Sequence, residues 1–331
     1  MRAVIHKDKK GYNGLTFVED FREPTPKEGE VKVKLKTAGL NHRDLFVLDR
    51  HNPDDPPFVI GSDGAGTVEQ VGVGVTDFLP GEEVMINPGL YWERLSDAPP
   101  EGFEVLGFPN NGTFADYVII PASAVVPKPD YLSWEEAGVF SLAALTAYRA
   151  LFTRGKLKEG MNVFIPGIGS GVATFLLQFA KAQGANVYVS SRSEEKRRRA
   201  VELGAVQAVD SEGDWSQEFG RAKMDLVIEC VGAATFNKSL DTLRKGGTIV
   251  TFGSSTGDEI EIDLRKFFYG QFNMLGSTMG SGEEFSAMLD FIQTHRIKPI
   301  MDRVYPLHKY QDAFDRLQEA NQFGKIAFTI S

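Results

Sequence analysis

The stretch NVFIPGIGSGVA, residues 162–173, decides the fold. Apolar residues typical of a buried strand lead into three glycines, and a helical stretch then continues to about Gln183. Glycine permits a tight turn with close backbone approach, and a helix N-terminus offers free N–H groups to a pyrophosphate. The spacing departs from G-x-G-x-x-G, because Val172 stands where the third glycine would be. The residues expected at the pyrophosphate are Gly167, Gly169, Ser170, Gly171 and Val172.

Short apolar strands alternate with helical stretches around this loop. The expected strands span residues 161–166, 186–191, 206–210, 225–230, 248–253 and 272–277. Strand and helix in alternation predict a doubly wound parallel sheet. The loop taken alone is compatible with an ordinary turn, and its place in this series favours a dinucleotide site.

The first third of the chain has a different character. Short β-type runs are cut by Gly and Pro, and VKVKL at 31–35 alternates in period two, which predicts an antiparallel, barrel-like domain. The last fifty or so residues contain expected helices at 283–294 and 310–318 and a strand at 325–330, too little to pack alone. We therefore expect a discontinuous catalytic domain, 1–128 with 280–331, and a dinucleotide-binding domain at 129–279.

Composition excludes several classes of function. The 331 residues carry a net charge of -9, which gives nucleic acid no basic face to bind. The start, MRAVI, runs into a strand and lacks a signal peptide or membrane span, so a cytoplasmic protein that binds no membrane is expected. Cys230 is the single cysteine, which rules out an intrachain disulfide and a Cys-rich zinc framework.

The end of the second strand bears on the choice of coenzyme. NAD-selective sites place an acidic residue there to bind the ribose 2′-hydroxyl, and this chain has Ser190-Ser191-Arg192 instead. Serine hydroxyls and the charges of Arg192 and Lys196 suit a 2′-phosphate, so NADP(H) is the expected cofactor. The alternative is that the cationic run 196–199, with Arg192, forms a solvated helix face.

Seven motifs in register carry a family resemblance. They are AGLNHRD (38–44), GSDGAG (61–66), GEEV (81–84), GTFADY (112–117), LTAY (145–148), the loop at 167–173 and GKI (324–326). With them the chain resembles the medium-chain dehydrogenase/reductase superfamily, within it the zinc-free quinone oxidoreductase and enoyl reductase branch. The resemblance implies an α/β protein, with a GroES-like antiparallel β-barrel catalytic domain and a Rossmann domain.

The zinc alcohol dehydrogenases of this superfamily have the same layout, so the metal ligands must be matched residue by residue. Their first Cys position carries Asn41 here, their His-Glu pair has become Ser62-Asp63, and their second Cys falls near Leu142. The segment 87–111, which in those enzymes holds a second zinc with four Cys, has none. Zinc prefers thiolate and imidazole donors, so no metal is expected.

The resemblance also implies roles for individual residues. Asn41 and Asp44 are expected near the substrate, although Asp44 is equally suited to capping the next helix. Tyr91 either lines the substrate mouth as a catalytic residue or packs, and His42 either contacts a cofactor phosphate or has an ordinary surface role. Phe46 stands where related quinone reductases have a tyrosine. Further cofactor contacts are expected from Thr146, Gly232, Phe252, Gly253, Ser254, Gly276, Ser277 and Lys325.

Together these features predict an NADPH-dependent, metal-independent reductase of quinones or α,β-unsaturated carbonyls. Two alternatives remain. One is an NADP-binding protein without turnover, like the lens crystallins recruited from this family. The other is a relative of the alcohol dehydrogenases that has lost zinc and acts on other carbonyls, because the segment 87–111 is retained. The resemblance further implies a homodimer joined through the sheet edge near residues 267–276.

Overall fold

The computed structural model describes residues 1–330. The chain forms two compact units, which we treat separately: unit 1 is Met1–Ala143 with the C-terminal segment from Gly280, and unit 2 is Ala144–Met279. Within residues 1–330, every helix falls short of the length and apolar character needed to cross a membrane.

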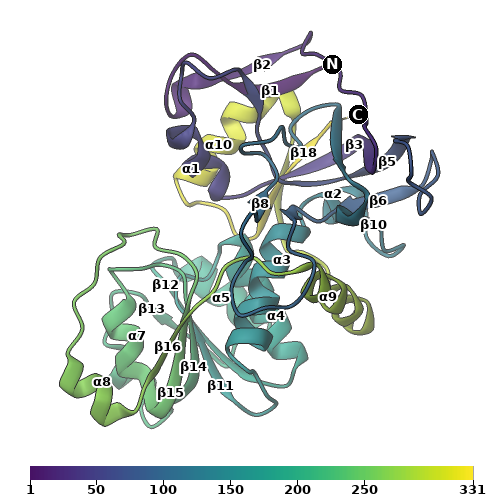
Figure 1. The fold of residues 1–331 in the computed structure, drawn as a ribbon. Helices are drawn as coiled ribbons and strands as arrows, with labels where there is room; N and C mark the ends of the chain where they lie inside the picture. Colours follow the sequence, from purple (N-terminus) through teal and green to yellow (C-terminus); the bar gives the residue numbers. More distant parts are fainter. Residues whose placement is uncertain (331) are drawn as a thin grey trace. The chain divides into compact units, whose positions relative to one another are not determined.

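Unit 1 is built around the long strand β3 (Glu30–Leu40), which lies inside a seven-stranded sheet. The strand order is β10-β6-β5-β3-β18-β17, and β9 also pairs with β3. Figure 1 labels β10, β6, β5, β3 and β18 of this sheet. The other strands are β5 (Asp63–Val71), β6 (Glu83–Ile86), β9 (Tyr117–Pro121), β10 (Val125–Pro127), β17 (Met301–Pro306) and β18 (Lys325–Thr329). Except for the parallel pair of β17 and β18, these strands pair antiparallel, as expected for the GroES-like domain.

Smaller elements complete unit 1. A three-stranded sheet has the order β2-β1-β4, and β7 pairs with β8 in a short antiparallel ladder. Their bounds are β1 (Ala3–His6), β2 (Leu15–Val18), β4 (Phe58–Val59), β7 (Gly89–Leu90) and β8 (Glu104–Val105), with 3-10 turns at Tyr12–Gly14, Ala122–Ala124 and Leu307–Lys309. The helices are α1 (Arg43–Arg50), α2 (Trp134–Gly138), α9 (Gly282–His295) and α10 (Tyr310–Gln318), and α3 (Ser141–Tyr148) crosses the boundary into unit 2.

The C-terminal segment supplies part of the core of unit 1. Strand β18 pairs antiparallel with β3, and Ile326 lies opposite Leu40. The rings of Phe114 and Phe328 meet edge to face with their centroids 4.9 Å apart. Because β18 lies beside the central strand, the N-terminal strands and this segment share one apolar core.

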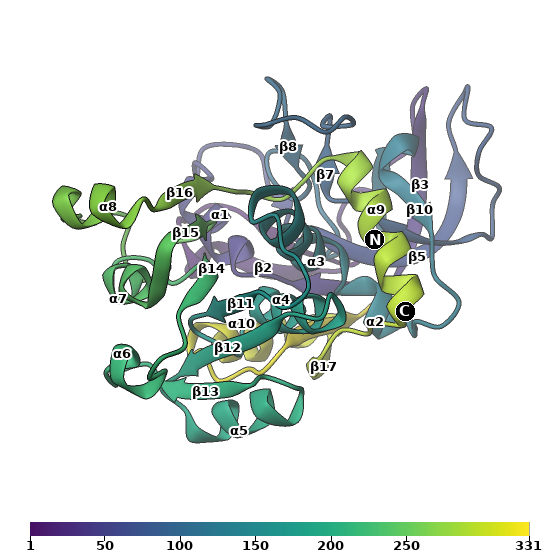
Figure 2. The same cartoon turned by 90° about the horizontal axis from the view of Figure 1, so that it is seen from below.

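Unit 2 is a six-stranded, fully parallel sheet in the order β13-β12-β11-β14-β15-β16 (Figure 2). Its strands are β11 (Asn162–Ile165), β12 (Asn186–Ser191), β13 (Gln207–Asp210), β14 (Met224–Glu229), β15 (Leu243–Thr251) and β16 (Asn273–Gly276). Its helices are α4 (Gly171–Ala182), α5 (Glu194–Glu202), α6 (Trp215–Glu218), α7 (Phe236–Thr242) and α8 (Leu264–Gly270), with a π-helix at Arg149–Arg154. The predicted doubly wound sheet is confirmed.

The first boundary between the units lies at 143/144, later along the chain than the 128/129 of the sequence analysis, because α2 packs on β3. A Cβ on Gly39 would lie 2.7 Å from the Cα of Val139, and one on Gly138 would lie 2.7 Å from the Cβ of Thr37. These two glycines therefore allow the backbones of α2 and β3 to approach closely, and this contact keeps α2 in unit 1. The second boundary lies at 279/280.

Candidate functional site

The glycine loop joins β11 to α4 in unit 2. Gly167 has φ +74° and Gly169 has φ +126°, backbone conformations that favour glycine. A Cβ on Gly167 would lie 2.8 Å from Val231, and one on Gly169 would lie 2.9 Å from the Cδ of Lys196. Ser170 is the N-cap of α4, and its hydroxyl accepts a hydrogen bond from the Ala173 N–H at 3.2 Å. The loop and the first turn of α4 fit a dinucleotide pyrophosphate.

The end of β12 lies beside this loop. The buried Ser190 hydroxyl accepts hydrogen bonds from the Gly167 N–H at 3.4 Å and from the Ser211 hydroxyl at 3.2 Å, so it holds the loop in place. Arg192 is exposed, and the aliphatic part of Lys196 lies against Gly169. The structure therefore places Lys196 at the loop, while Arg192 follows the last residue of β12.

The other predicted cofactor residues of unit 2 follow the carboxyl ends of neighbouring parallel strands, which meet at one edge of the sheet. Gly232 comes after β14, residues 252–254 come after β15, and Gly276 ends β16 with Ser277 next. The Ser277 N–H donates to the Thr251 carbonyl at 2.8 Å. Thr146 lies on α3 and is buried.

Sequence reasoning missed Glu229, which ends β14 and is fully buried. One carboxylate oxygen accepts from the N–H groups of Val231 at 2.8 Å and Gly232 at 3.2 Å. Hydroxyls of Thr235, at 2.9 Å, and Ser239, at 2.6 Å, also donate to this carboxylate. Glu229 thus fixes the Gly232 turn at the cofactor edge. The available signal was an acidic residue at the end of an otherwise apolar strand.

Unit 1 holds a cluster around Lys325, whose side chain is only 2% exposed. Its ammonium donates to the Asn41 side-chain oxygen at 2.5 Å, the Leu40 carbonyl at 3.2 Å and the Asp63 carboxylate at 3.4 Å. Asn41 in turn donates from Nδ2 to Asp63 Oδ2 at 3.0 Å. Burial lowers the pKa of Lys325, while the Asp63 and Asp44 carboxylates oppose that change. The partners of Lys325 are therefore in unit 1, although the resemblance suggested a pyrophosphate contact.

Asp44 lies in the first turn of α1 and is fully buried. The N-cap is His42, which is exposed, so Asp44 is not the helix cap that the sequence suggested. Its carboxylate accepts from the Asn41 N–H at 2.8 Å and from the Ser62 hydroxyl at 3.4 Å. Asp44 therefore fixes the positions of Asn41 and Ser62. Burial raises the pKa of Asp44 to about 6, and neighbouring Arg43 opposes this rise.

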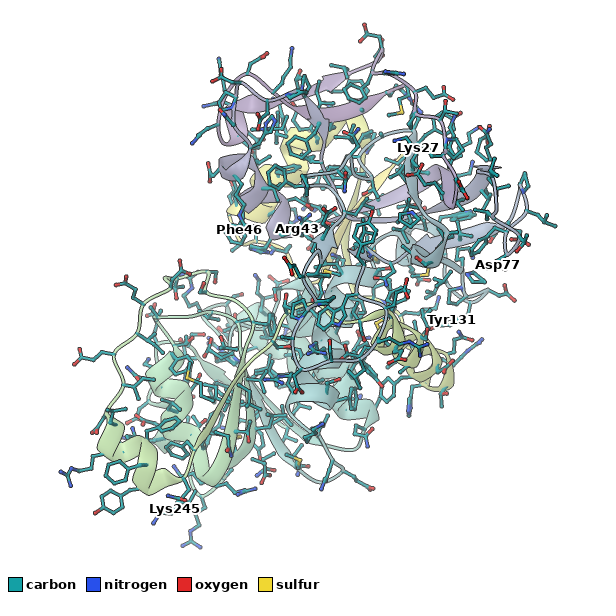
Figure 3. The ribbon with its side chains drawn as sticks, in the orientation of Figure 1. Lys27, Arg43, Phe46, Asp77, Tyr131 and Lys245 are labelled. Atoms are coloured by element: carbon teal, nitrogen blue, oxygen red, sulfur yellow. The ribbon has the colours of Figure 1, made fainter. Side chains whose placement is uncertain are left out.

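Arg43 links the Asp44 network to the segment 87–111, which we call the lobe. Its Nη1 donates to the Ser62 hydroxyl at 3.1 Å and to the Leu106 carbonyl at 2.9 Å. Figure 3 labels Arg43 together with Phe46, which is one turn further along α1 and exposed. Within the lobe, Trp92 is buried and packs, while Tyr91 is 58% exposed and has φ +65°.

A parallel sheet with a glycine loop at the first turn of a helix, in a chain that also contains a β-barrel-like unit, defines a class: the two-domain dehydrogenases and reductases that bind a nicotinamide dinucleotide. Two family models match the chain, "Alcohol dehydrogenase GroES-like domain" over residues 27–130 and "Zinc-binding dehydrogenase" over residues 171–294. The chain belongs to the medium-chain dehydrogenase/reductase superfamily.

Individual relatives agree with this family. The zinc-type alcohol dehydrogenase-like protein YogA of Leptosphaeria maculans is 34% identical over 98% of each chain. The crotonyl-CoA reductase of Streptomyces avermitilis is 32% identical over 98% of this chain and 87% of its own. A solved structure described as an NAD-dependent alcohol dehydrogenase matches with a TM-score of 0.93 and 36% identity, covering 100% of both chains.

One family description names zinc, and the residues at the ligand positions do not fit that metal. Asn41, Ser62 and Leu142 offer neither thiolate nor imidazole. The Asn41 oxygen instead accepts a hydrogen bond from Lys325, whose charge would repel a metal ion. Among residues 1–330, no three His, Cys, Asp or Glu side chains are grouped so that they could hold a metal.

The raised pKa of Asp44 predicts a pH-dependent stability. The folded state binds a proton at Asp44 between pH 3.8 and about 6, where the unfolded state has lost it. This stabilisation is complete below pH 3.8 and is lost as the pH rises through about 6, by on the order of 3 kcal/mol. In Asp44→Asn the amide oxygen still accepts the Asn41 N–H without a charge. Urea unfolding of both proteins from pH 4 to 7 should therefore show wild type losing stability relative to the variant, and parallel curves would contradict the assignment.

Proposed function

We propose that the protein is an NADPH-dependent, metal-independent reductase that transfers hydride to quinones or α,β-unsaturated carbonyl compounds. The observation that carries this proposal is the Lys325 ammonium bonded to Asn41 and Asp63, the positions where zinc relatives bind the catalytic metal. Such a site offers no Lewis acid to activate an alcohol or an unconjugated carbonyl. Acceptors that are already electron-poor remain suitable.

The preference for the phosphorylated coenzyme rests on the end of β12. Ser190, Ser191 and Arg192 stand where an acidic residue would repel a 2′-phosphate. Ser190 supports the Gly167 loop, and we assign the phosphate contact to Arg192, with Lys196 as a second cation next to Gly169. The bound reduced nicotinamide supplies the hydride.

The chain must also supply a proton. Hydride addition to the β-carbon of an enone leaves negative charge on the carbonyl oxygen, and protonation then completes the reduction. Asn41 and Asp44 are engaged in the buried network, so they support the site. We assign the proton to Tyr91, whose exposed hydroxyl has no hydrogen-bond partner within residues 1–330. In a quinone the same hydroxyl would donate to the reduced oxygen.

A second candidate is a reductase of other carbonyls, descended from a zinc alcohol dehydrogenase. The retained lobe favours this alternative, because it is the segment in which zinc relatives hold their second metal. A substrate panel separates the two candidates.

The principal test measures NADPH oxidation with quinones, enones and simple aldehydes, alongside metal analysis of the purified protein. We expect turnover with quinones or enones and weak activity with simple aldehydes. Activity should be unchanged by EDTA or by added Zn²⁺. Tight NADPH binding with no acceptor reduced would support the non-enzymatic alternative, and stoichiometric zinc that turnover requires would contradict the proposal.

Arg192→Ala should weaken NADPH binding about tenfold to a hundredfold, since a charge-assisted hydrogen bond contributes about 1.5–3 kcal/mol. NADH lacks the phosphate and should bind with nearly unchanged affinity. Arg198→Ala is the matched control, because Arg198 pairs with Glu202 on the exposed face of α5. Coenzyme fluorescence titrations measure both affinities. Equal losses for NADPH and NADH would refute the phosphate contact.

We also propose that two copies of the chain join through the edge strand β16. Within the described residues 1–330, this strand pairs only with β15, and exposed apolar side chains lie on or near it, among them Met274 and Phe268. An unpaired apolar edge invites pairing with another strand. Parallel sheets from two subunits would then form one continuous sheet.

Met274→Asp should weaken the dimer, because the substitution places a charge on the apolar edge. Light scattering after gel filtration should give twice the chain mass for wild type and a lower mass for the variant in dilute solution. Val73→Asp, at an exposed apolar residue of unit 1, is the control and should remain dimeric. A monomeric wild type would eliminate the proposed interface.

A further inference from the structure

The hydrogen bonds of the buried Glu229 carboxylate fall into two sets. Its Oε1 atom accepts from the N–H groups of Val231 and Gly232 and from the Thr235 hydroxyl. Its Oε2 atom accepts from the Ser239 hydroxyl, which belongs to α7. Removal of the carboxylate would take the acceptor from two backbone N–H groups, and an unsatisfied buried donor is costly. Oε1 therefore holds the turn that follows β14, while Oε2 is bonded to the helix.

The turn held by Glu229 also contacts the glycine loop that follows β11. A Cβ on Gly167 would lie 2.8 Å from Cγ2 of Val231, so glycine at this position leaves room for the Val231 side chain. Gly167 is the first glycine of the loop that fits a pyrophosphate. A shift of the Val231 backbone would therefore disturb the loop at its first glycine.

Residues 254–257, which come after β15, are joined to the same turn. The Thr256 N–H and the Thr256 hydroxyl each donate to the Val231 carbonyl at 2.8 Å. A Cβ on Gly232, which has φ +97°, would lie 2.8 Å from the Cα of Ser254, so only glycine fits this close approach. Three loops, which follow β11, β14 and β15, therefore meet at Val231 and Gly232.

The order of the strands assigns these loops to one half of a dinucleotide. Strand β12, at which we place the 2′-phosphate contact, lies on one side of β11, and β14 and β15 lie on the other side. In open parallel sheets a dinucleotide binds across the carboxyl ends of the strands, with its pyrophosphate at the glycine loop of the first strand. A coenzyme with its adenosine ribose at β12 therefore extends its nicotinamide half toward the loops after β14 and β15.

We propose that Glu229 is a positioning residue for the nicotinamide half of the coenzyme, because it holds Val231 and Gly232 where the three loops of unit 2 meet. This inference rests on the coenzyme binding in the proposed function, and it does not depend on which acceptor is reduced. Glu229 bonds to backbone N–H groups, so it acts on the coenzyme through the turn. Its removal should affect the dinucleotides and spare a fragment that lacks nicotinamide.

Titrations of the full-length Glu229→Ala variant with coenzymes and with a fragment test the proposal. NADPH and NADH share the nicotinamide half, so both affinities should fall by the same factor, about tenfold to a hundredfold, since the lost hydrogen bonds involve a charged group. Adenosine 2′,5′-bisphosphate carries the 2′-phosphate without nicotinamide, and its affinity should stay the same. Isothermal titration calorimetry measures all three affinities.

Two further variants separate positioning from stability. Glu229→Gln keeps an oxygen for the N–H groups of the turn, and its amide can donate to the Ser239 hydroxyl, so it should retain most of the NADPH affinity. Asp302→Ala is the matched control, because Asp302 of unit 1 is another buried carboxylate that accepts from a backbone N–H, that of Phe323 at 3.0 Å. This control should lower the free energy of unfolding and leave NADPH affinity unchanged.

Thr256→Val reaches the same turn from its exposed side. The substitution removes the hydroxyl that donates to the Val231 carbonyl and changes the shape of an exposed side chain very little, so the variant should fold. NADPH affinity should fall by about threefold to tenfold, the value of one ordinary hydrogen bond, while the affinity for adenosine 2′,5′-bisphosphate stays the same. This variant decides the question if Glu229→Ala does not fold, and unchanged NADPH affinity in it would then overturn the proposal.

The remaining outcomes keep this inference apart from the proposed function. Equal losses for NADPH and for the adenosine fragment in Glu229→Ala would show a structural role only, and unchanged NADPH affinity would show no role in binding; either result overturns the proposal. A wild type that binds NADPH and reduces no acceptor would contradict the proposed reductase activity and leave the role of Glu229 standing. A wild type that binds neither NADPH nor NADH would overturn both.

Discussion

The burial of the Lys325 ammonium is the constraint on which the rest of unit 1 depends. A charge removed from water must be paired and hydrogen-bonded, and Lys325 has three acceptors, on Leu40, Asn41 and Asp63. These acceptors lie at the end of β3 and the start of β5, whereas Lys325 opens β18. The C-terminal segment must therefore return to the first strands of the chain, and the charge of the same ammonium would repel a metal cation at this position.

A chain of polar contacts extends from this cluster. The Asp44 carboxylate accepts from the Asn41 N–H and the Ser62 hydroxyl, and Arg43 connects Ser62 with the lobe. The lobe is held again on its other side by the first turn of α9. Hydrogen bonds thus fix the residues at the zinc-ligand positions and the lobe, the two places where zinc relatives bind metal ions. In such a network, the loss of one partner leaves a buried polar group unsatisfied, so its members are strongly interdependent.

Local patterns predicted the parts of the fold that local physics determines. The glycine loop, the six parallel strands and the helix at 310–318 follow from periodicity and turn chemistry, and the structure contains them. The Lys325–Asn41 contact, which joins residues 284 positions apart, and the Leu95–Glu283 contact, at 188, depend on topology, and no short-range pattern encodes them. The same holds for α2, whose placement depends on glycines facing each other from distant segments. Of the two roles that the sequence left open for Asp44, capping of the helix is wrong, because its carboxylate accepts from the Asn41 N–H and His42 is the N-cap of α1.

The geometry of unit 1 also bears on the kind of acceptor that suits the site. In a simple carbonyl, hydride attacks the carbon bonded to the oxygen that gains charge, so activation is needed at the reacting centre itself. In an enone or a quinone, charge moves through conjugation to an oxygen remote from the attacked carbon. A proton donor that reaches this remote oxygen is then sufficient, even if it lies on a different structural element from the residues next to the attacked carbon. Tyr91, which is exposed on the lobe and has φ +65°, is the donor we propose, whereas Asn41, Asp63 and Lys325 are hydrogen-bonded to one another. The hydrogen-bonded side chains at the zinc-ligand positions therefore support the proposed reduction of conjugated acceptors.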